Sequence, residues 1–119
     1  MKKILWISRH TMTKEQVNDL KRIFNDDIEV IPYKDTVKSV YELKEPIADV
    51  DIIAAVLPIG LMGELLTIAG DKPVLNSVSE RRITGKTIIS ANGTEEPEVE
   101  FVHMKWQQML KVKIITKDL

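Results

Sequence analysis

Three polar residues that suit phosphate chemistry, Ser8, Arg9 and His10, follow directly after an apolar run at positions 4–7. The guanidinium group of Arg9 stays charged at any cellular pH and can donate two hydrogen bonds to one phosphate. His10 is one of two histidines in the chain, and its imidazole can transfer a proton near neutral pH or donate a hydrogen bond. Together with Thr11, these residues predict a site for a negatively charged ligand.

A second candidate loop follows the apolar run at positions 52–56 and leads into a predicted helix. The first turn of that helix offers free amides and the positive end of the helix dipole, which attract anions. Glycine at position 60 lets a ligand approach the backbone closely. Asn76 and Ser77 end a later strand and are expected beside the two loops. The residues of the second loop are Leu57, Pro58, Ile59, Gly60 and Leu61.

Each of these features also has a purely structural interpretation. Arg9 could pair with Glu15 or Asp19 at a polar strand exit, and Pro58 could simply set a tight turn from strand to helix. His103 lies in an alternating stretch, which favours a packed strand residue over a catalytic one. These alternatives stay open on the sequence alone.

The elements that position these residues alternate between strands and helices. Strands are predicted at residues 2–8, 28–31, 51–57 and 73–78, and helices at 13–24, 36–44 and 59–70. Thr13 and Gln16 fit a capping box at the start of the first helix. This order requires right-handed crossovers and a parallel sheet with helices on both faces, which is a three-layer α/β sandwich. Ligands bind such sheets at the carboxyl ends of the strands, so both candidate loops meet if the first and third strands are neighbours.

The pattern changes after residue 84. Residues 87–89 read as a short strand, and a polar loop follows them. Residues 99–106 and 110–116 alternate between apolar and polar side chains, which predicts half-buried strands in an antiparallel pair at the sheet edge. Arg81 and Arg82 are expected in a solvent-exposed loop. The length of 119 residues fits a single domain that spans 1–119.

Composition excludes several classes of function. The net charge is −1, and a large surface for long nucleic acids would require a strongly basic balance. The chain has no cysteine, which excludes thiolate chemistry, and its two histidines are far apart in sequence, so no metal site is expected. The patterns of the common dinucleotide and nucleoside triphosphate sites are absent, and no cofactor is expected. Neither a secretory signal nor an apolar run long enough to span a membrane is seen, which favours a cytoplasmic protein with no membrane partner.

Two short motifs resemble a known family. "ISRH" after the first strand, and "AAVLPIGLMGEL" after "ADVD", are similar to motifs of the small CRISPR-associated Rossmann-like proteins of type III systems. The matching positions are Ser8, Arg9 and His10, then Asp51, Leu57, Pro58 and Leu61, with Thr13 and Gln16 similar to one branch of the family. The resemblance covers approximately residues 4–78.

The resemblance implies a Rossmann-like fold and a role in antiviral defence. Members of the family bind cyclic oligoadenylate, the second messenger of type III immunity, and either degrade it as ring nucleases or sequester it. On this basis Arg9, His10 and Ser8 are the candidate catalytic residues for metal-independent cleavage, in which the ribose 2′-hydroxyl attacks the adjacent phosphorus. Thr11, Asn76 and Ser77 and the second loop are the candidate ligand-binding residues. A cyclic oligoadenylate is symmetric and is best bound by a symmetric protein assembly, so a homodimer is expected.

Two other classes of function stay open. A non-catalytic sponge would use the same pocket without turnover of the nucleotide. A regulatory domain of flavodoxin-like shape would bind another protein and no nucleotide. The resemblance fits a chain that is encoded either by a host or by a phage.

Overall fold

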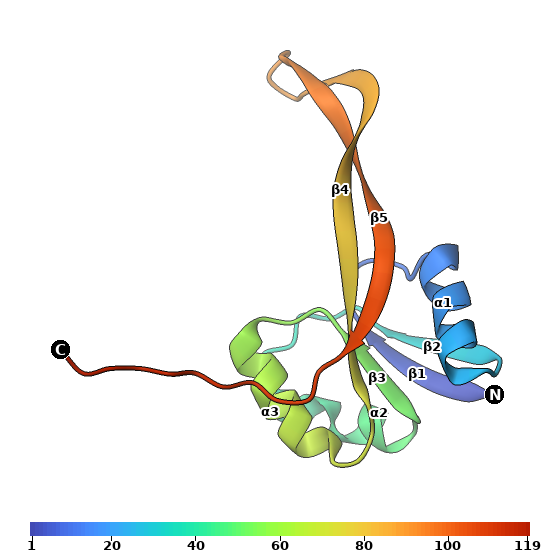
Figure 1. Ribbon diagram of the computed structural model, residues 1–119, viewed down its shortest axis with the longest axis vertical. Helices are drawn as coiled ribbons and strands as arrows, with labels where there is room; N and C mark the ends of the chain where they lie inside the picture. Colours follow the sequence, from blue (N-terminus) through green and yellow to red (C-terminus); the bar gives the residue numbers. More distant parts are fainter.

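A computed structural model describes residues 1–119 and shows an α/β domain built on one five-stranded sheet (Figure 1). The strand order is β2-β1-β3-β4-β5, in which β5 is antiparallel to β4 and every other pair is parallel. The strands are β1 (Lys2–Ile7), β2 (Ile28–Tyr33), β3 (Ile52–Ala55), β4 (Val74–Ile89) and β5 (Glu95–Gln108). The helices are α1 (Lys14–Phe24), the short 3₁₀ helix η1 (Val40–Leu43), α2 (Lys44–Ala48) and α3 (Ile59–Ala69).

Two apolar layers form on opposite faces of the sheet because side chains alternate along each strand. Leu5 and Ile7 of β1 pack on one face with residues of η1, α2 and α3. Ile4 and Trp6 pack on the other face with Leu20 of α1 and with Trp106 of β5. The predicted three-layer α/β sandwich, with a mostly parallel sheet and an antiparallel addition, is therefore confirmed, and its architecture is consistent with a Rossmann-like sandwich.

Helix α1 begins with the predicted capping box. The Gln16 amide donates to Thr13 Oγ1 at 3.2 Å, and the Thr13 amide donates to Gln16 Oε1 at 2.8 Å. The two longest helices, α1 and α3, have 11 residues each. No helix combines the length and the apolar character that crossing a bilayer requires.

The helix predicted at 36–44 is wrong in its position and type. The structure has the 3₁₀ helix η1 followed directly by α2, and α2 continues through Pro46 to Ala48. Pro46 is the third residue of α2, where an amide hydrogen would have no partner within the helix. Proline therefore does not end the helix here, and the helical segment extends four residues beyond the predicted end at residue 44.

The predicted C-terminal strand pair is only partly correct, because residues 99–106 do lie in the antiparallel edge strand β5 but do not pair with residues 110–116. Strand β4 runs on to Ile89, and the turn at Asn92 and Gly93 returns β5 antiparallel along it, so the partner of β5 is β4 (Figure 1). Residues 110–116 form no strand; this part of the chain crosses α3, where Val112 packs against the apolar layer. Arg81 and Arg82 lie on strand β4 instead of in a loop, although both are exposed as expected.

Candidate ligand-binding site

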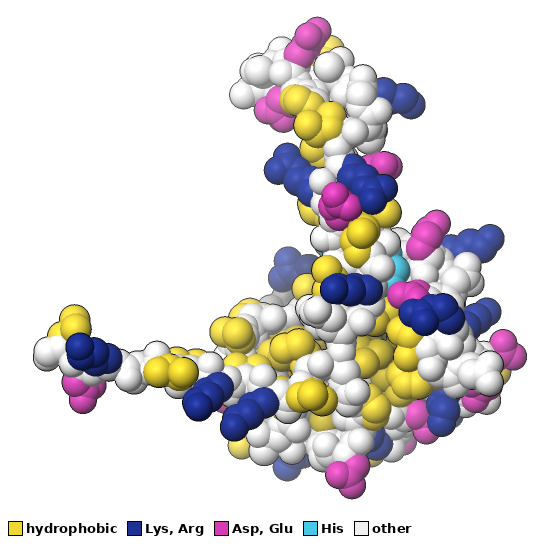
Figure 2. Space-filling view, viewed as in Figure 1, with side chains coloured by type: hydrophobic (Ala, Val, Ile, Leu, Met, Phe, Trp, Pro, Cys, Tyr) yellow, Lys and Arg dark blue, Asp and Glu magenta, His cyan; other side chains and the backbone are white.

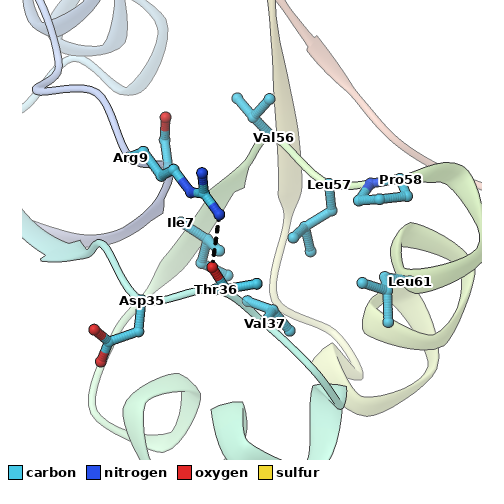
Figure 3. A pocket seen from close by; sticks show the side chains of 10 residues that line it. Ile7, Arg9, Asp35, Thr36, Val37, Val56, Leu57, Pro58 and Leu61 are labelled. Carbon is cyan, nitrogen blue, oxygen red and sulfur yellow. Dashed lines mark hydrogen bonds between the residues drawn. The ribbon is translucent and has the colours of Figure 1, made fainter.

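The loops after β1, β2 and β3 meet at one edge of the sheet. Strand β1 lies between β2 and β3 and is parallel to both, so their carboxyl ends point the same way. The expected adjacency of the first and third strands is therefore confirmed. A cavity of about 270 Å³ opens at this edge and is lined by Ser8, Arg9, Thr36, Leu57 and Pro58 among others (Figure 3). We refer to it as the Arg9 cavity.

The Arg9 side chain is oriented by a neutral partner. Its Nη2 donates a hydrogen bond to Thr36 Oγ1 at 2.7 Å, and Arg9 forms no salt bridge. The alternative pairing of Arg9 with Glu15 or Asp19 is thus not observed. Asp35 also lines the cavity, but its carboxylate points away from the guanidinium in Figure 3. The remaining donors of Arg9 have no carboxylate to bind, which leaves its charge available to an anion.

The second predicted loop contributes only partly to the Arg9 cavity. Leu57, Pro58 and Leu61 line it, whereas Ile59 and Gly60 do not. Pro58 is the N-cap residue of α3 and no side chain caps the first turn, so the amides of that turn lack partners within the helix. Ile59 is 65% exposed, and Ile59 and Gly60 lie in a separate hollow that faces the C-terminal segment.

A second and larger cavity, of about 590 Å³, lies on the α1 side of the sheet. We refer to it as the histidine cavity because His10 and His103 both line it. Ser8 and Val56 line both this cavity and the Arg9 cavity, so the two spaces adjoin. The consecutive residues Arg9 and His10 therefore line different cavities.

The loop that carries His10 is fixed through its backbone. The His10 amide donates to Ser8 Oγ at 3.1 Å, and the His10 carbonyl accepts from Trp6 Nε1 at 2.7 Å. No protein group hydrogen-bonds the imidazole of this exposed residue. The Thr11 hydroxyl accepts a hydrogen bond from Lys34 Nζ at 3.3 Å, and Thr11 also lines the histidine cavity. His10 is thus available to a ligand in the histidine cavity.

His103 belongs to a chain of hydrogen bonds that sequence reasoning missed. Its side chain is 6% exposed, which confirms that it is a packed strand residue, yet it also lines the histidine cavity. His103 Nε2 lies 2.8 Å from Asp19 Oδ2, and His103 Nδ1 lies 3.3 Å from Ser77 Oγ. The Ser77 hydroxyl also accepts from Gln16 Nε2 at 3.0 Å. A consistent arrangement has the imidazole donating from Nε2 to the carboxylate and accepting the Ser77 proton at Nδ1.

The ionisation of Asp19 follows from these partners. Burial raises the pKa of its carboxyl group, but hydrogen bonds from His103 and Arg22 and the positive charge of Arg22 outweigh burial, so the pKa lies below its ordinary value. Asp19 is 84 positions from His103 in the chain, and no local pattern signals their contact. The sequence signals near this network were Gln16 of the capping box and Ser77 at the end of its predicted strand.

Two remaining predicted residues have different positions. Ser77 lines the histidine cavity, but Asn76 lines neither cavity, because successive strand residues point to opposite faces of the sheet.

No cluster of three or more His, Asp or Glu side chains is arranged to hold a metal ion.

The sheet edge therefore combines a guanidinium that has no carboxylate partner with two adjoining cavities, one of which is lined by both imidazoles.

In comparisons with known proteins, no family model, curated protein or solved structure matches this chain.

Proposed function

We propose that this chain binds a cyclic oligoadenylate at the carboxyl edge of its sheet. The observation that carries the proposal is the position of Arg9, a cation with no carboxylate partner that lines a cavity at this edge. A phosphate diester is an anion that a guanidinium fork recognises. The class of ligand is taken from the resemblance of "ISRH" and of Leu57, Pro58 and Leu61 to the CRISPR-associated family.

The two adjoining cavities fit a ligand made of alternating phosphates and nucleosides. Their volumes, about 270 and 590 Å³, are within or close to the range of small-molecule pockets. When one phosphate binds in the Arg9 cavity, the neighbouring nucleoside passes over Ser8 and enters the histidine cavity. There Trp6 and Phe101 supply apolar surface and Ser77 supplies a hydroxyl.

Cleavage of the bound ring is the second part of the proposal, and the exposed imidazole of His10 beside Ser8 favours it. The ribose 2′-oxygen forms a bond to the adjacent phosphorus while the bond from phosphorus to the 5′-oxygen breaks. The 2′-proton passes to a base, and the departing 5′-oxygen takes a proton from an acid. In this proposal His10 transfers a proton, Ser8 orients the reacting groups, and Arg9 stabilises the charge on the phosphoryl oxygens. The consequence in a cell is a lower level of the messenger and weaker type III immunity.

Binding and turnover are tested on the same preparation. Isothermal titration with cyclic tri-, tetra- and hexa-adenylate measures affinity and ring size, with linear oligoadenylate as the control for non-specific charge attraction. Chromatography of the titrated samples then detects linear products with a 2′,3′-cyclic phosphate. Binding without products supports a sponge. No heat of binding and no thermal shift with any of the rings contradicts the proposal and favours a protein-interaction domain.

A further inference from the structure

The paired strands β4 and β5 project far beyond the rest of the domain (Figure 1). Only Val74 and Leu75 of β4 pair with β3, so the outer residues of β4 have β5 as their sole partner. We call residues 79–89 of β4 and 95–103 of β5 the arm. The radius of gyration is 17.0 Å, whereas a compact domain of this length would have about 13.5 Å. Beyond its base, where His103 contacts α1, the arm therefore stands in solvent with both of its faces uncovered.

One face of the arm is largely apolar, although Arg81 also lies on it. Directly opposed residues share a face, and Ile83 opposes Val99 while Arg81 opposes Phe101. Ile83 is 70% exposed and Phe101 is 73% exposed. The other face is polar, with Arg82 opposite Glu100. A ribbon of two strands is marginally stable in water, so a covering partner would stabilise the apolar face.

The C-terminal segment, residues 109–119, which we call the tail, packs on the apolar layer through Met109 and Val112 and is otherwise exposed. Leu110 and Ile114 alternate with lysines as in a strand, yet the tail has no strand partner and extends away from the domain (Figure 1). Leu110 is 79% exposed and Ile114 is 72% exposed. Figure 2 shows apolar side chains at the surface of both the arm and the tail. A strand pattern without a partner leaves backbone groups open to pairing with another chain.

The charges of the tail and of the β5 strand of the arm are complementary. The tail carries Lys111, Lys113 and Lys117, and the β5 side of the arm carries Glu95, Glu96, Glu98 and Glu100. Strand β5 is also the edge of the sheet, so its outer backbone groups are open to a further strand. Each copy of the chain has one arm and one tail, and a twofold pair satisfies both arms and both tails at once.

From these features we infer that two copies of this chain associate, with the tail of one copy lying along the β5 edge of the arm of the other. The apolar face that holds Ile83 and Phe101 is buried in the same contact. Phe101 also lines the histidine cavity, so the partner borders that cavity on its outer side. This inference does not depend on the proposed nucleotide ligand, because it is argued from exposure, strand pattern and charge.

Charge reversal with rescue tests the contact between tail and arm. Light scattering of the full chain is expected to give twice the subunit mass of 13.6 kDa. The double variant Lys111→Glu with Lys113→Glu, and separately Glu98→Lys with Glu100→Lys, should each weaken the homodimer by about tenfold or more. An equimolar mixture of the two double variants should restore the dimer, because each tail then meets an arm of opposite charge. A contact within one chain would not be restored by mixing.

A matched pair of exposed aromatic residues tests the apolar face. Phe101→Asp should weaken the dimer by about tenfold or more, and Tyr41→Asp, which changes a 68% exposed residue on η1, should leave it unchanged. Circular dichroism verifies that every variant folds. A monomeric parent chain overturns the inference. So does a dimer that Phe101→Asp and both charge reversals leave intact, because its interface would then lie elsewhere.

Discussion

His103 Nε2 lies 2.8 Å from Asp19 Oδ2, and this contact ties the base of the arm to helix α1. The same imidazole approaches Ser77 Oγ through Nδ1 at 3.3 Å, so one buried ring joins α1, β4 and β5. A buried polar group that loses its partner costs about 1–3 kcal/mol. The network therefore holds the walls of the histidine cavity together.

The contact between Asp19 and His103 makes stability depend on acid pH. The pKa of Asp19 is lower in the folded chain than its ordinary value of 3.8. Its contribution to the free energy of unfolding is therefore complete above that ordinary value and is lost as the pH falls through the lowered pKa. Asp19→Asn should reduce the free energy of unfolding near neutral pH by about 1–3 kcal/mol, and the difference from the parent should shrink below about pH 4.

Urea unfolding at a series of pH values measures this difference. Glu29→Gln is the control, because Glu29 is an exposed residue of β2 that forms no salt bridge. Its difference from the parent should stay near zero at every pH. A difference for Asp19→Asn that does not change with pH contradicts the role assigned to the carboxylate.

Arg9→Ala should weaken the binding of cyclic oligoadenylate about tenfold or more, since a charge-assisted contact is worth about 1.5–3 kcal/mol. Arg9→Lys should recover only part of the affinity, because an ammonium group cannot form the two parallel hydrogen bonds of a guanidinium. Thr36→Ala should have a smaller effect, since Thr36 only orients the guanidinium. Titration calorimetry measures all three, and Lys21→Ala, which removes an exposed charge from α1, controls for net charge. Equal affinity of Arg9→Ala and parent would exclude Arg9 from the site.

The two histidines should respond differently to replacement. His10→Ala should leave the affinity nearly unchanged while the rate of ring cleavage falls by about two to four powers of ten. Its melting temperature should stay close to that of the parent, because no protein group hydrogen-bonds the imidazole. His103→Ala should instead lower the melting temperature, since it removes the hydrogen bonds that join the imidazole to Asp19 and Ser77. Single-turnover rates and thermal scans separate these effects, and an unchanged rate in His10→Ala would rule out His10 as the proton-transfer residue.

The capping box of α1 should contribute measurably to stability. Thr13→Ala removes the oxygen that accepts from the Gln16 amide and should lower the free energy of unfolding by about 0.5–2 kcal/mol. Thr67→Ala, within the exposed face of α3, is the matched control and should change it by less than about 0.5 kcal/mol. Urea unfolding at neutral pH measures both variants. Equal losses in the two would mean that the cap makes no specific contribution.

Local sequence patterns were sufficient to predict the elements whose structure depends on residues close together in the chain. The continuous apolar run that ends at Ile7 predicted a strand, and it is β1, an interior strand whose residues 4–7 are buried. The hydroxyl of Thr13 and the amide of Gln16 predicted the cap of α1, because the two residues are only one helical turn apart. The alternation of strands and helices then limited the fold to a three-layer α/β sandwich.

Tertiary structure decided the features that depend on contacts between residues far apart in the chain. The alternation in residues 110–116 is typical of a strand. The turn at Asn92 and Gly93, however, makes β5 the antiparallel partner of β4, and the tail then has no strand to pair with. Pro46 continues a helix because its position in the first turn needs no amide hydrogen.

For the candidate site, the sequence determined which groups stand at the end of β1, and the packing of the elements determined what each group meets. Arg9 and His10 are neighbours in the chain, but they line different cavities on the two sides of Ser8. His103 reaches the same cavity as His10 only because β5 folds back along β4 and lies against α1. Contacts across 84 positions leave no periodic signal in a single sequence, since either partner alone is compatible with a solvent-exposed or a packed position.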